Sequence, residues 1–233
     1  MMSKKLKMTI PCLAVVILFV LHVQILMAQS APVKRLVIID AAHGGTDAGV
    51  IVTDKIREKE VTLILAQLLQ KELAKSPGIQ TQLTRTSDKT LSFAERVKMI
   101  KTGSGETLFI SLHVNAGFGK KATGYEIYFP GFKMSATDQN DSKAILQDMV
   151  QNKYLNDSVR LAQMIQRNME NVFPRKGRGL RDAPIPMLGD LSIPAVILEV
   201  GFATHPDDRK KILNEKTQQT IAQTLAKSIS DYF

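Results

Sequence analysis

Three short apolar runs lie far apart in the chain, and each is followed by a residue that can bind a metal or transfer a proton. The runs cover residues 36–39, 108–112 and 194–198. The polar residues that follow them are His43, His113 and Glu199. Short runs rich in β-branched residues and bounded by Gly, Pro or Asn are typical of buried strands. We therefore predict three central strands that end in candidate functional side chains.

Helical periodicity between these runs indicates how the strands are connected. Apolar residues recur at helical spacing over residues 60–74, and Ser76, Pro77 and Gly78 end that segment. Further elements are expected as strands at 79–83 and 124–129 and as helices at 91–101, 157–173 and 218–232. Strands that alternate with helices form parallel sheets. The pattern predicts a single α/β domain with a mostly parallel, twisted central sheet flanked by helices.

The predicted topology brings the three polar residues together. The carboxyl ends of parallel strands meet at one edge of the sheet, where open α/β sheets hold their ligands. His43, His113 and Glu199 are therefore expected to converge there. Two imidazoles and one carboxylate with an open position form a known hydrolytic zinc arrangement. The spacing alone offers Glu199 as the third ligand, although a lone histidine is more often an ordinary polar residue.

The first thirty residues differ in character from the rest of the chain. Three lysines precede an almost wholly apolar stretch at 8–27, and Ala28 and Ser30 offer small residues for cleavage. These features are typical of a secretory signal peptide over residues 1–30. The apolar stretch is also about long enough to remain as an uncleaved membrane anchor. We expect a periplasmic or secreted protein whose catalytic domain covers residues 31–233.

The net charge limits the candidate binding partners, and the cysteine content limits the candidate chemistry. The chain has 31 Lys and Arg residues against 22 Asp and Glu residues, a formal net charge of +9. A basic surface attracts anionic partners, but no aromatic-interleaved basic cluster points to nucleic acid. A cell-wall polymer or an anionic lipid surface is the better candidate, with the membrane contacted through the N-terminal segment if that segment is not cleaved. The one cysteine, Cys12, lies in that segment, so the rest of the chain offers no thiol chemistry.

Residues 130–156 form an unusually long polar connection. Five polar residues run from Asp138 to Ser142, and only a short amphipathic piece at 144–150 has helical spacing. Connections of this length are uncommon in compact domains and are often functional. A regulatory insert and a surface excursion without a role both fit the pattern.

Five motifs, taken in order along the chain, resemble those of one family of cell-wall enzymes. They lie at residues 39–49 (IDAAHGGTDAG), 57–61 (REKEV), 84–88 (TRTSD) with Arg96, 109–116 (FISLHVNA) and 193–202 (IPAVILEVGF). Together they resemble the zinc-dependent N-acetylmuramoyl-L-alanine amidases of the amidase-3 type, which are bacterial cell-wall hydrolases. The resemblance covers residues 33–233. It implies a phosphorylase/hydrolase-like α/β fold, Zn²⁺ as the cofactor and peptidoglycan as the substrate.

The resemblance also assigns roles to individual residues. By position in the motifs, the zinc ligands fall on His43, Glu58 and His113. Glu199 becomes the catalytic base, which takes a proton from water and returns it to the leaving alanine nitrogen. Taken alone, Glu58 looks like part of a solvated charge run that opens a helix. It is chemically sensible that Glu58 binds the metal and that a different residue, Glu199, accepts the proton, because a carboxylate that binds a metal is a poor proton acceptor.

The sequence departs from the family pattern at two places, and two arginines match it. An Ala-Ala pair replaces the usual Pro-Gly before His43, and His205 replaces an asparagine. We interpret both as tuning of activity, with His205 as a surface or cap residue rather than a fourth ligand. Arg85 and Arg96 match family positions and are interpreted as structural charges near the sheet edge, and only weakly as substrate contacts.

The resemblance implies a regulatory partner as well. In division-associated members of the family, the segment equivalent to residues 130–156 includes a helix that covers the zinc cleft until an activator protein displaces it. By analogy, Asp138 or Asp141 is expected over the metal, and an activator is expected to act on this insert. A zinc peptidase of the stem peptide and a non-catalytic wall-binding regulator are the alternatives. The new amine and carbonyl ends of the released products would distinguish a peptidase from an amidase. The complete set of metal ligands and catalytic base argues against a non-catalytic regulator.

Overall fold

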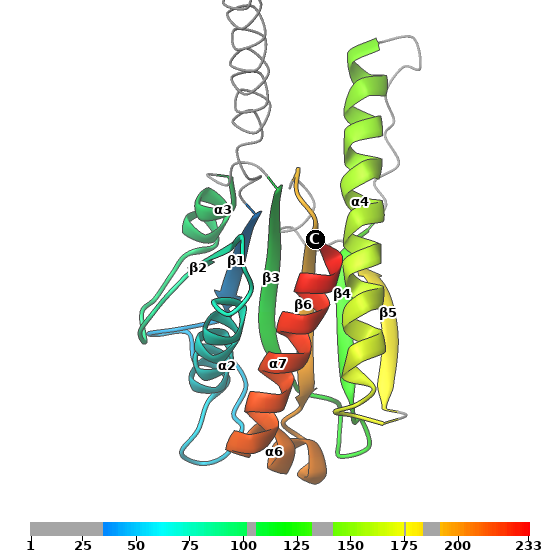
Figure 1. Ribbon diagram of the computed structural model, residues 1–233. Helices are drawn as coiled ribbons and strands as arrows, with labels where there is room; N and C mark the ends of the chain where they lie inside the picture. Colours follow the sequence, from blue (N-terminus) through cyan, green and yellow to red (C-terminus); the bar gives the residue numbers. More distant parts are fainter. Residues whose placement is uncertain (1–34, 102–105, 132–141, 175, 184–191) are drawn as a thin grey trace, which may run out of the picture. The chain divides into compact units, whose positions relative to one another are not determined.

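The computed structural model describes residues 35–101, 106–131, 142–174, 176–183 and 192–233 (Figure 1). Every described residue belongs to one compact unit, Lys34–Phe233. The predicted signal peptide therefore lies outside the described residues. Within the described part of the chain, none of the helices is both long and apolar enough to span a membrane.

A six-stranded mixed sheet forms the centre of the domain, with the strand order β2-β1-β3-β6-β4-β5. Its strands are β1 (Arg35–Ala41), β2 (Ile79–Leu83), β3 (Glu106–Asn115), β4 (Tyr125–Pro130), β5 (Gly177–Ala183) and β6 (Ala195–Phe202). Strands β2, β1, β3 and β6 are parallel, as predicted. Strand β4 runs antiparallel to β6, and β5 runs parallel to β4. The prediction of an α/β domain with a mostly parallel sheet is confirmed.

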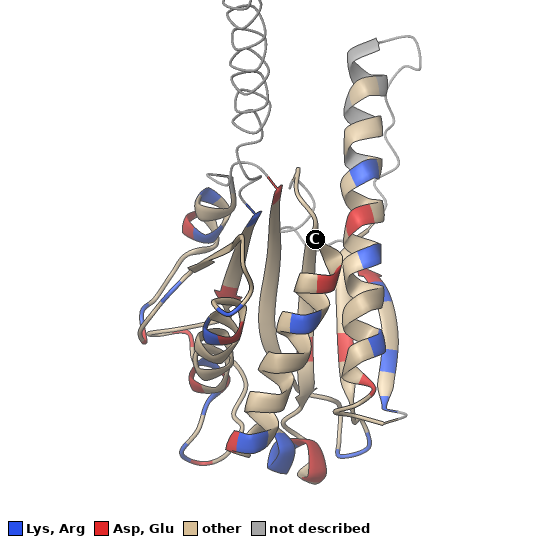
Figure 2. Cartoon of the chain, viewed as in Figure 1, with Lys and Arg blue, Asp and Glu red and all other residues tan. Residues whose placement is uncertain are grey.

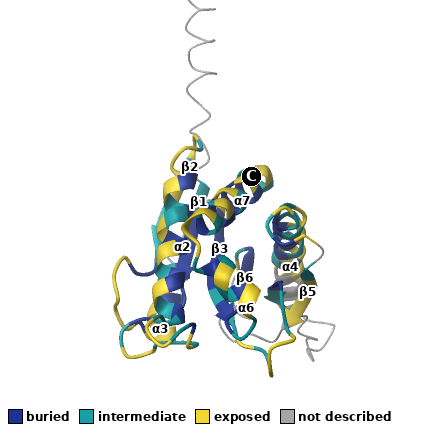
Figure 3. Ribbon diagram, turned by 90° about the horizontal axis from the view of Figure 1, so that it is seen from below, coloured by how far each residue is buried: buried dark blue, intermediate teal, exposed yellow. Residues whose placement is uncertain are grey.

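Helices cover both faces of this sheet. The described helices are α2 (Glu58–Leu73), α3 (Phe93–Lys101), α4 (Ser142–Met169), α6 (Pro206–Ile212) and α7 (Glu215–Tyr232). Helices α2, α7 and α4 lie side by side over one face, and α3 lies on the other (Figures 1 and 3). The face under α2, α7 and α4 carries the larger core, while Ile100 of α3 belongs to a smaller cluster with Ile38 and Phe109.

The alternation of side chains along the strands decides which face carries the candidate site. Leu112 and Val114 of β3, like Leu198 and Val200 of β6, are buried in the larger core. Because successive side chains of a strand point to opposite faces, the residue between each pair projects from the other face. His113 is the β3 residue concerned, and it lies directly opposite Glu199 in the pairing of β3 with β6.

One prediction about the long connection is wrong. The amphipathic piece at 144–150 and the helix expected from residue 157 are parts of a single 28-residue helix, α4. Neither Gly nor Pro interrupts the sequence of α4, and Ser158 does not cap a helix start. Its hydroxyl instead donates to the carbonyl of Tyr154 at 2.7 Å and accepts from the Ala195 amide at 2.9 Å, as a serine inside a helix can do. Residues 132–141, which include Asp138 and Asp141, lie outside the described residues.

The sequence patterns missed β5 and α6, and a buried aspartate ties α6 to the sheet. Asp208 is fully buried in the first turn of α6. Its carboxylate accepts hydrogen bonds from the hydroxyl of Thr123 at 2.8 Å, the amide of Gly124 at 2.7 Å and the amide of Phe202 at 3.2 Å. This single side chain therefore joins the start of β4 to the end of β6.

We expect the substitution Asp208→Ala to lower the free energy of unfolding by about 2–4 kcal/mol, because two buried amides and a hydroxyl would lose their acceptor. Urea unfolding followed by far-UV circular dichroism measures the change. The neighbouring Asp207 is exposed, so Asp207→Ala is the matched control and should change stability by less than about 1 kcal/mol. Equal losses in the two variants would contradict this role of Asp208.

Candidate metal and catalytic site

His43 lies in the loop that follows β1, in a backbone conformation that few residues with a side chain adopt. Its φ is 60°, and the loop continues through Gly44 and Gly45, which also have positive φ. The Nδ1 atom of His43 lies 2.9 Å from a carboxylate oxygen of Asp47. A carboxylate on one ring nitrogen orients an imidazole and leaves the other nitrogen free to bind a metal. In this case the free nitrogen is Nε2, which faces Glu58 at 3.1 Å.

Glu58 is the first residue of α2 and is only 1% exposed, so the view of it as part of a solvated charge run is wrong. Its two oxygens accept hydrogen bonds at 2.9 Å from the amides of Val114 and Val50. Burial raises the pKa of Glu58, but the contacts with His113 and His43 outweigh burial and hold the pKa well below its usual range. Glu58 is therefore a buried carboxylate anion, held by the loop after β1 and by the end of β3.

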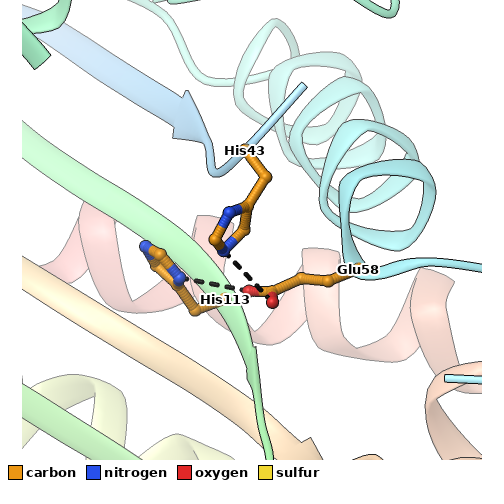
Figure 4. A group of neighbouring side chains, drawn as sticks. All are labelled: His43, Glu58 and His113. Atoms are coloured by element: carbon orange, nitrogen blue, oxygen red, sulfur yellow. Dashed lines mark hydrogen bonds and ion pairs between the residues drawn. The ribbon is translucent and has the colours of Figure 1, made fainter. Parts of the chain in front are cut away.

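His113, near the end of β3, completes a group of three side chains (Figure 4). Its Nδ1 atom lies 3.1 Å from Glu58, and its ring meets the His43 ring edge to face at 5.3 Å between centroids. One ligand atom from each of His43, Glu58 and His113 lies within 4.8 Å of the others. In the part of the chain that the structure describes, this is the only such group. Two imidazoles and one carboxylate fit the donor set of a catalytic zinc site.

A close backbone approach makes this grouping possible. Gly49 has a φ of 65° and passes directly beside the cluster. A Cβ atom at this position would lie 2.6 Å from a Glu58 oxygen and 2.7 Å from the His43 ring. Only glycine fits there without displacing the two candidate ligands.

Glu199 lies beside the group rather than in it. It stands on β6 opposite His113. Among the described residues, its Oε2 is the only buried side-chain oxygen or nitrogen without a hydrogen-bond partner. Such atoms are rare in folded proteins and call for an explanation. Burial raises the pKa of Glu199 to about 7, which is suitable for a group that exchanges protons near neutral pH.

Two buried arginines hold the loop that carries His43. Arg96 donates to the carbonyl of His43 at 2.7 Å and forms an ion pair with Asp40. Arg85 donates to the carbonyls of Ala42, at 3.0 Å, and Lys59, at 2.6 Å, so it links this loop to the start of α2. The interpretation of both arginines as structural charges is confirmed.

The remaining predicted residue, His205, caps a helix. It is the N-cap of α6, and its ring accepts a hydrogen bond from the Asp208 amide. The interpretation of His205 as a cap residue is confirmed. Sequence reasoning missed Asp47, Asp40 and Gly49, although the spacing of Asp47 four residues after His43 is a signal that could have found the first of them.

An open α/β sheet that carries two histidines and a buried carboxylate at its carboxyl edge is typical of a metal-dependent hydrolase. Residues 37–231 match the N-acetylmuramoyl-L-alanine amidase family (amidase-3), and the chain belongs to that family. It is 28% identical to the amidase AmiA of Salmonella typhimurium over 223 residues, which cover 86% of this chain and 76% of AmiA.

Solved structures of amidases share the fold. The amidase from Clostridium difficile 630 has a TM-score of 0.69 and 28% identity, and the match covers 85% of this chain and 96% of that one. The CwlD amidase of Clostridioides difficile, solved in complex with the GerS lipoprotein, has a TM-score of 0.68 and 25% identity, with 84% of this chain and 97% of that one covered.

We expect Arg96→Met to lower the free energy of unfolding by about 3–5 kcal/mol, because the buried carboxylate of Asp40 would lose its cation. The side chains of Arg96 and Asp40 are 9% and 1% exposed. The control is Arg35→Met, since Arg35 pairs with Glu106 and these side chains are 37% and 53% exposed. Exposed pairs contribute at most about 1 kcal/mol. Chemical denaturation of both variants measures the difference, and similar losses would contradict a special role for Arg96.

Proposed function

We propose that this protein is a zinc-dependent amidase that hydrolyses the bond between the lactyl group of N-acetylmuramic acid and the first alanine of the peptidoglycan stem peptide. Its membership of the amidase family supports the reaction. The observation that carries the proposal is the unpartnered Oε2 of Glu199 beside the group of His43, Glu58 and His113. A buried carboxylate oxygen without a partner, next to a ready set of metal ligands, is suited to move a proton during hydrolysis.

The ligand set fits a bound zinc ion in its chemistry. His43, through Nε2, Glu58 and His113 would hold the ion, with Asp47 orienting the His43 ring. When bound, zinc supplies Lewis-acid polarisation of the amide carbonyl and lowers the pKa of a water molecule. The amides of Val50 and Val114 keep Glu58 in place from both sides.

Glu199 moves the proton in this scheme. Its Oε2 accepts a proton from the attacking water and then donates it to the alanine nitrogen as the amide bond breaks. Its position on β6 opposite His113 places it at the same edge of the sheet as the ligands. Because Glu199 is not one of the three grouped ligands, its carboxylate is available for this role.

We further propose that the protein acts on peptidoglycan outside the cytoplasm, with residues 1–30 as its export signal. The name of the relative AmiA supports a cell-wall substrate. A protein regulator would contact the insert at 130–156. The CwlD–GerS complex supports this kind of partner, and so do the side chains of Leu146 and Met149 on α4, which are 61% and 63% exposed.

The test uses residues 31–233 on purified peptidoglycan, with mass spectrometry of the soluble products. We expect free stem peptides with an N-terminal alanine, which are lost with a chelator and restored by zinc. Glu199→Gln should lower kcat by about 10²–10⁴-fold with an unchanged zinc content. Glu215→Gln, at an exposed position, is the control. Near-normal turnover of Glu199→Gln would refute its role, and cleavage within the peptide would indicate the alternative peptidase.

Zinc affinity should depend on pH through His43. In the metal-free protein, the contact with Glu58 raises the pKa of His43 to about 9. Zinc binds the neutral imidazole, so binding at lower pH must displace a proton. We expect the affinity to rise by about tenfold per pH unit between pH 6.5 and 8.5. Competition with a chelator of known affinity measures this slope, and a flat profile would contradict the coupling between His43 and Glu58.

A further inference from the structure

A second buried carboxylate, Glu126, lies next to the catalytic candidate and has no role in the scheme above. It is 4% exposed and stands on β4 directly opposite Glu199. Asn115 donates to it at 2.8 Å and the hydroxyl of Tyr128 at 2.9 Å. The guanidinium groups of Arg178 and Arg181 complete its surroundings. The row across the sheet thus runs from His113 through Glu199 to Glu126.

Two arginines of β5 meet at this carboxylate. The Nε atom of Arg178 lies 2.7 Å and Nη2 of Arg181 lies 3.2 Å from the same oxygen of Glu126. Figure 2 shows basic residues on β5 beside the one acidic residue of β4. The guanidinium of Arg178 also lies over the ring of Phe202 at 5.3 Å, which fixes its orientation.

A β-bulge makes this convergence possible. Residues three apart in a regular strand point to opposite faces of the sheet. Tyr125 pairs with Gly177 and Ile127 with Leu180, so β5 contains one more residue than β4 over this interval. Gly179, with a φ of 92°, lies in the extra segment. The bulge turns Arg181 to the same side as Arg178, and bulges often aim side chains in this way next to active sites.

The ion pairs of Glu126 contain more positive than negative charge. One buried carboxylate faces two guanidinium cations, whose side chains are 39% and 45% exposed. A single arginine would neutralise Glu126, and neither arginine contacts Glu199, whose Oε2 is unpartnered. Each guanidinium carries five N–H donors, of which the described contacts use only those facing Glu126. The arginines are therefore held in place by a carboxylate and still present cationic donors to solvent.

In the proposed substrate, the anionic groups that could bind these arginines lie only on the peptide side of the scissile bond. The lactyl carboxyl of muramic acid is consumed in the scissile amide, and both amino sugars are N-acetylated, so the negative charges of a muramyl peptide are carboxylates of the stem peptide. The two guanidinium groups meet Glu126 on β4, and β4 lies one strand spacing, roughly 5 Å, from Glu199 on β6. An extended peptide covers that distance in about two residues. A carboxylate early in the stem peptide is therefore within reach.

We propose that Arg178 and Arg181, positioned by Glu126 and the bulge at Gly179, bind a carboxylate of the stem peptide near its second residue. This inference rests on the proposed amidase function and names the group that the enzyme recognises beyond the scissile bond. Arginine suits the task because its planar fork matches a carboxylate. The site would favour muramyl peptides whose second residue is glutamate with a free carboxylate over the corresponding amide.

The experiment compares two synthetic muramyl peptides that differ only in whether the carboxylate of the second residue is free or amidated. For the wild-type protein we expect KM to be about tenfold lower for the free acid. Arg181→Gln should remove this preference while kcat stays within about twofold, and Arg181→Lys should keep part of it. Arg35→Gln is the matched control, because Arg35 has a similar exposure and an ion pair at the same 3.2 Å distance.

Binding measured without turnover separates this inference from the proposed function. Calorimetric titration of both peptides into the Glu199→Gln variant, with and without Arg181→Gln, reports the preference directly. Loss of the binding preference in the Arg181→Gln variant supports the carboxylate site, whether or not the wild-type protein cleaves the peptides. Failure of the wild-type protein to cleave either peptide would refute the amidase proposal but not the carboxylate site. Equal affinity for the two peptides, or an equal effect of Arg181→Gln on both, would overturn the carboxylate site.

Discussion

The candidate site depends on one buried carboxylate, that of Glu58. A charged group so fully removed from water is costly unless every oxygen is partnered. Here the partners are the amide of Val50 in the loop after β1, the amide of Val114 near the end of β3, and two imidazoles. Because these partners lie after β1 and near the end of β3, Glu58 ties the first turn of α2 to the ends of both strands. Gly49 serves the same arrangement by leaving room beside Glu58. Arg85 and Arg96 serve it by holding the surrounding backbone through hydrogen bonds to carbonyl groups.

The two faces of the sheet have different roles, one in stability and one in function. The face under α2, α7 and α4 carries the larger apolar core, and the opposite face presents His113, Glu199 and Glu126 in one row across three strands. Strand alternation therefore allows the same strands to stabilise the domain and to display its chemistry. The antiparallel strand β4 and its neighbour β5 extend this row beyond the parallel part of the sheet, where β5 adds two cations.

Much of the fold could be predicted from the sequence because its strongest signals are local. The apolar runs of β1, β3 and β6 and the periodic helices between them predicted the parallel sheet. Strand β5 was missed because its sequence, GRGLRDA, lacks the β-branched residues and regular alternation that indicate a strand. Helix α4 was divided in two because Asp157 and Ser158 look like a helix start, whereas in the structure Ser158 bonds a carbonyl of its own helix and the amide of Ala195.

By itself, the sequence determined the strands that carry or precede His43, His113 and Glu199. It also determined the order of the family motifs and, through them, the four candidate residues. It could not decide that Glu58 is buried, since its charged neighbours hide that property from any local pattern. Only the tertiary structure brought Glu58 between the two histidines, left Glu199 with an unpartnered oxygen and turned Arg181 toward Glu126. These outcomes depend on strand register, on a bulge and on contacts between residues more than 40 positions apart, which no local pattern of apolar and polar residues encodes.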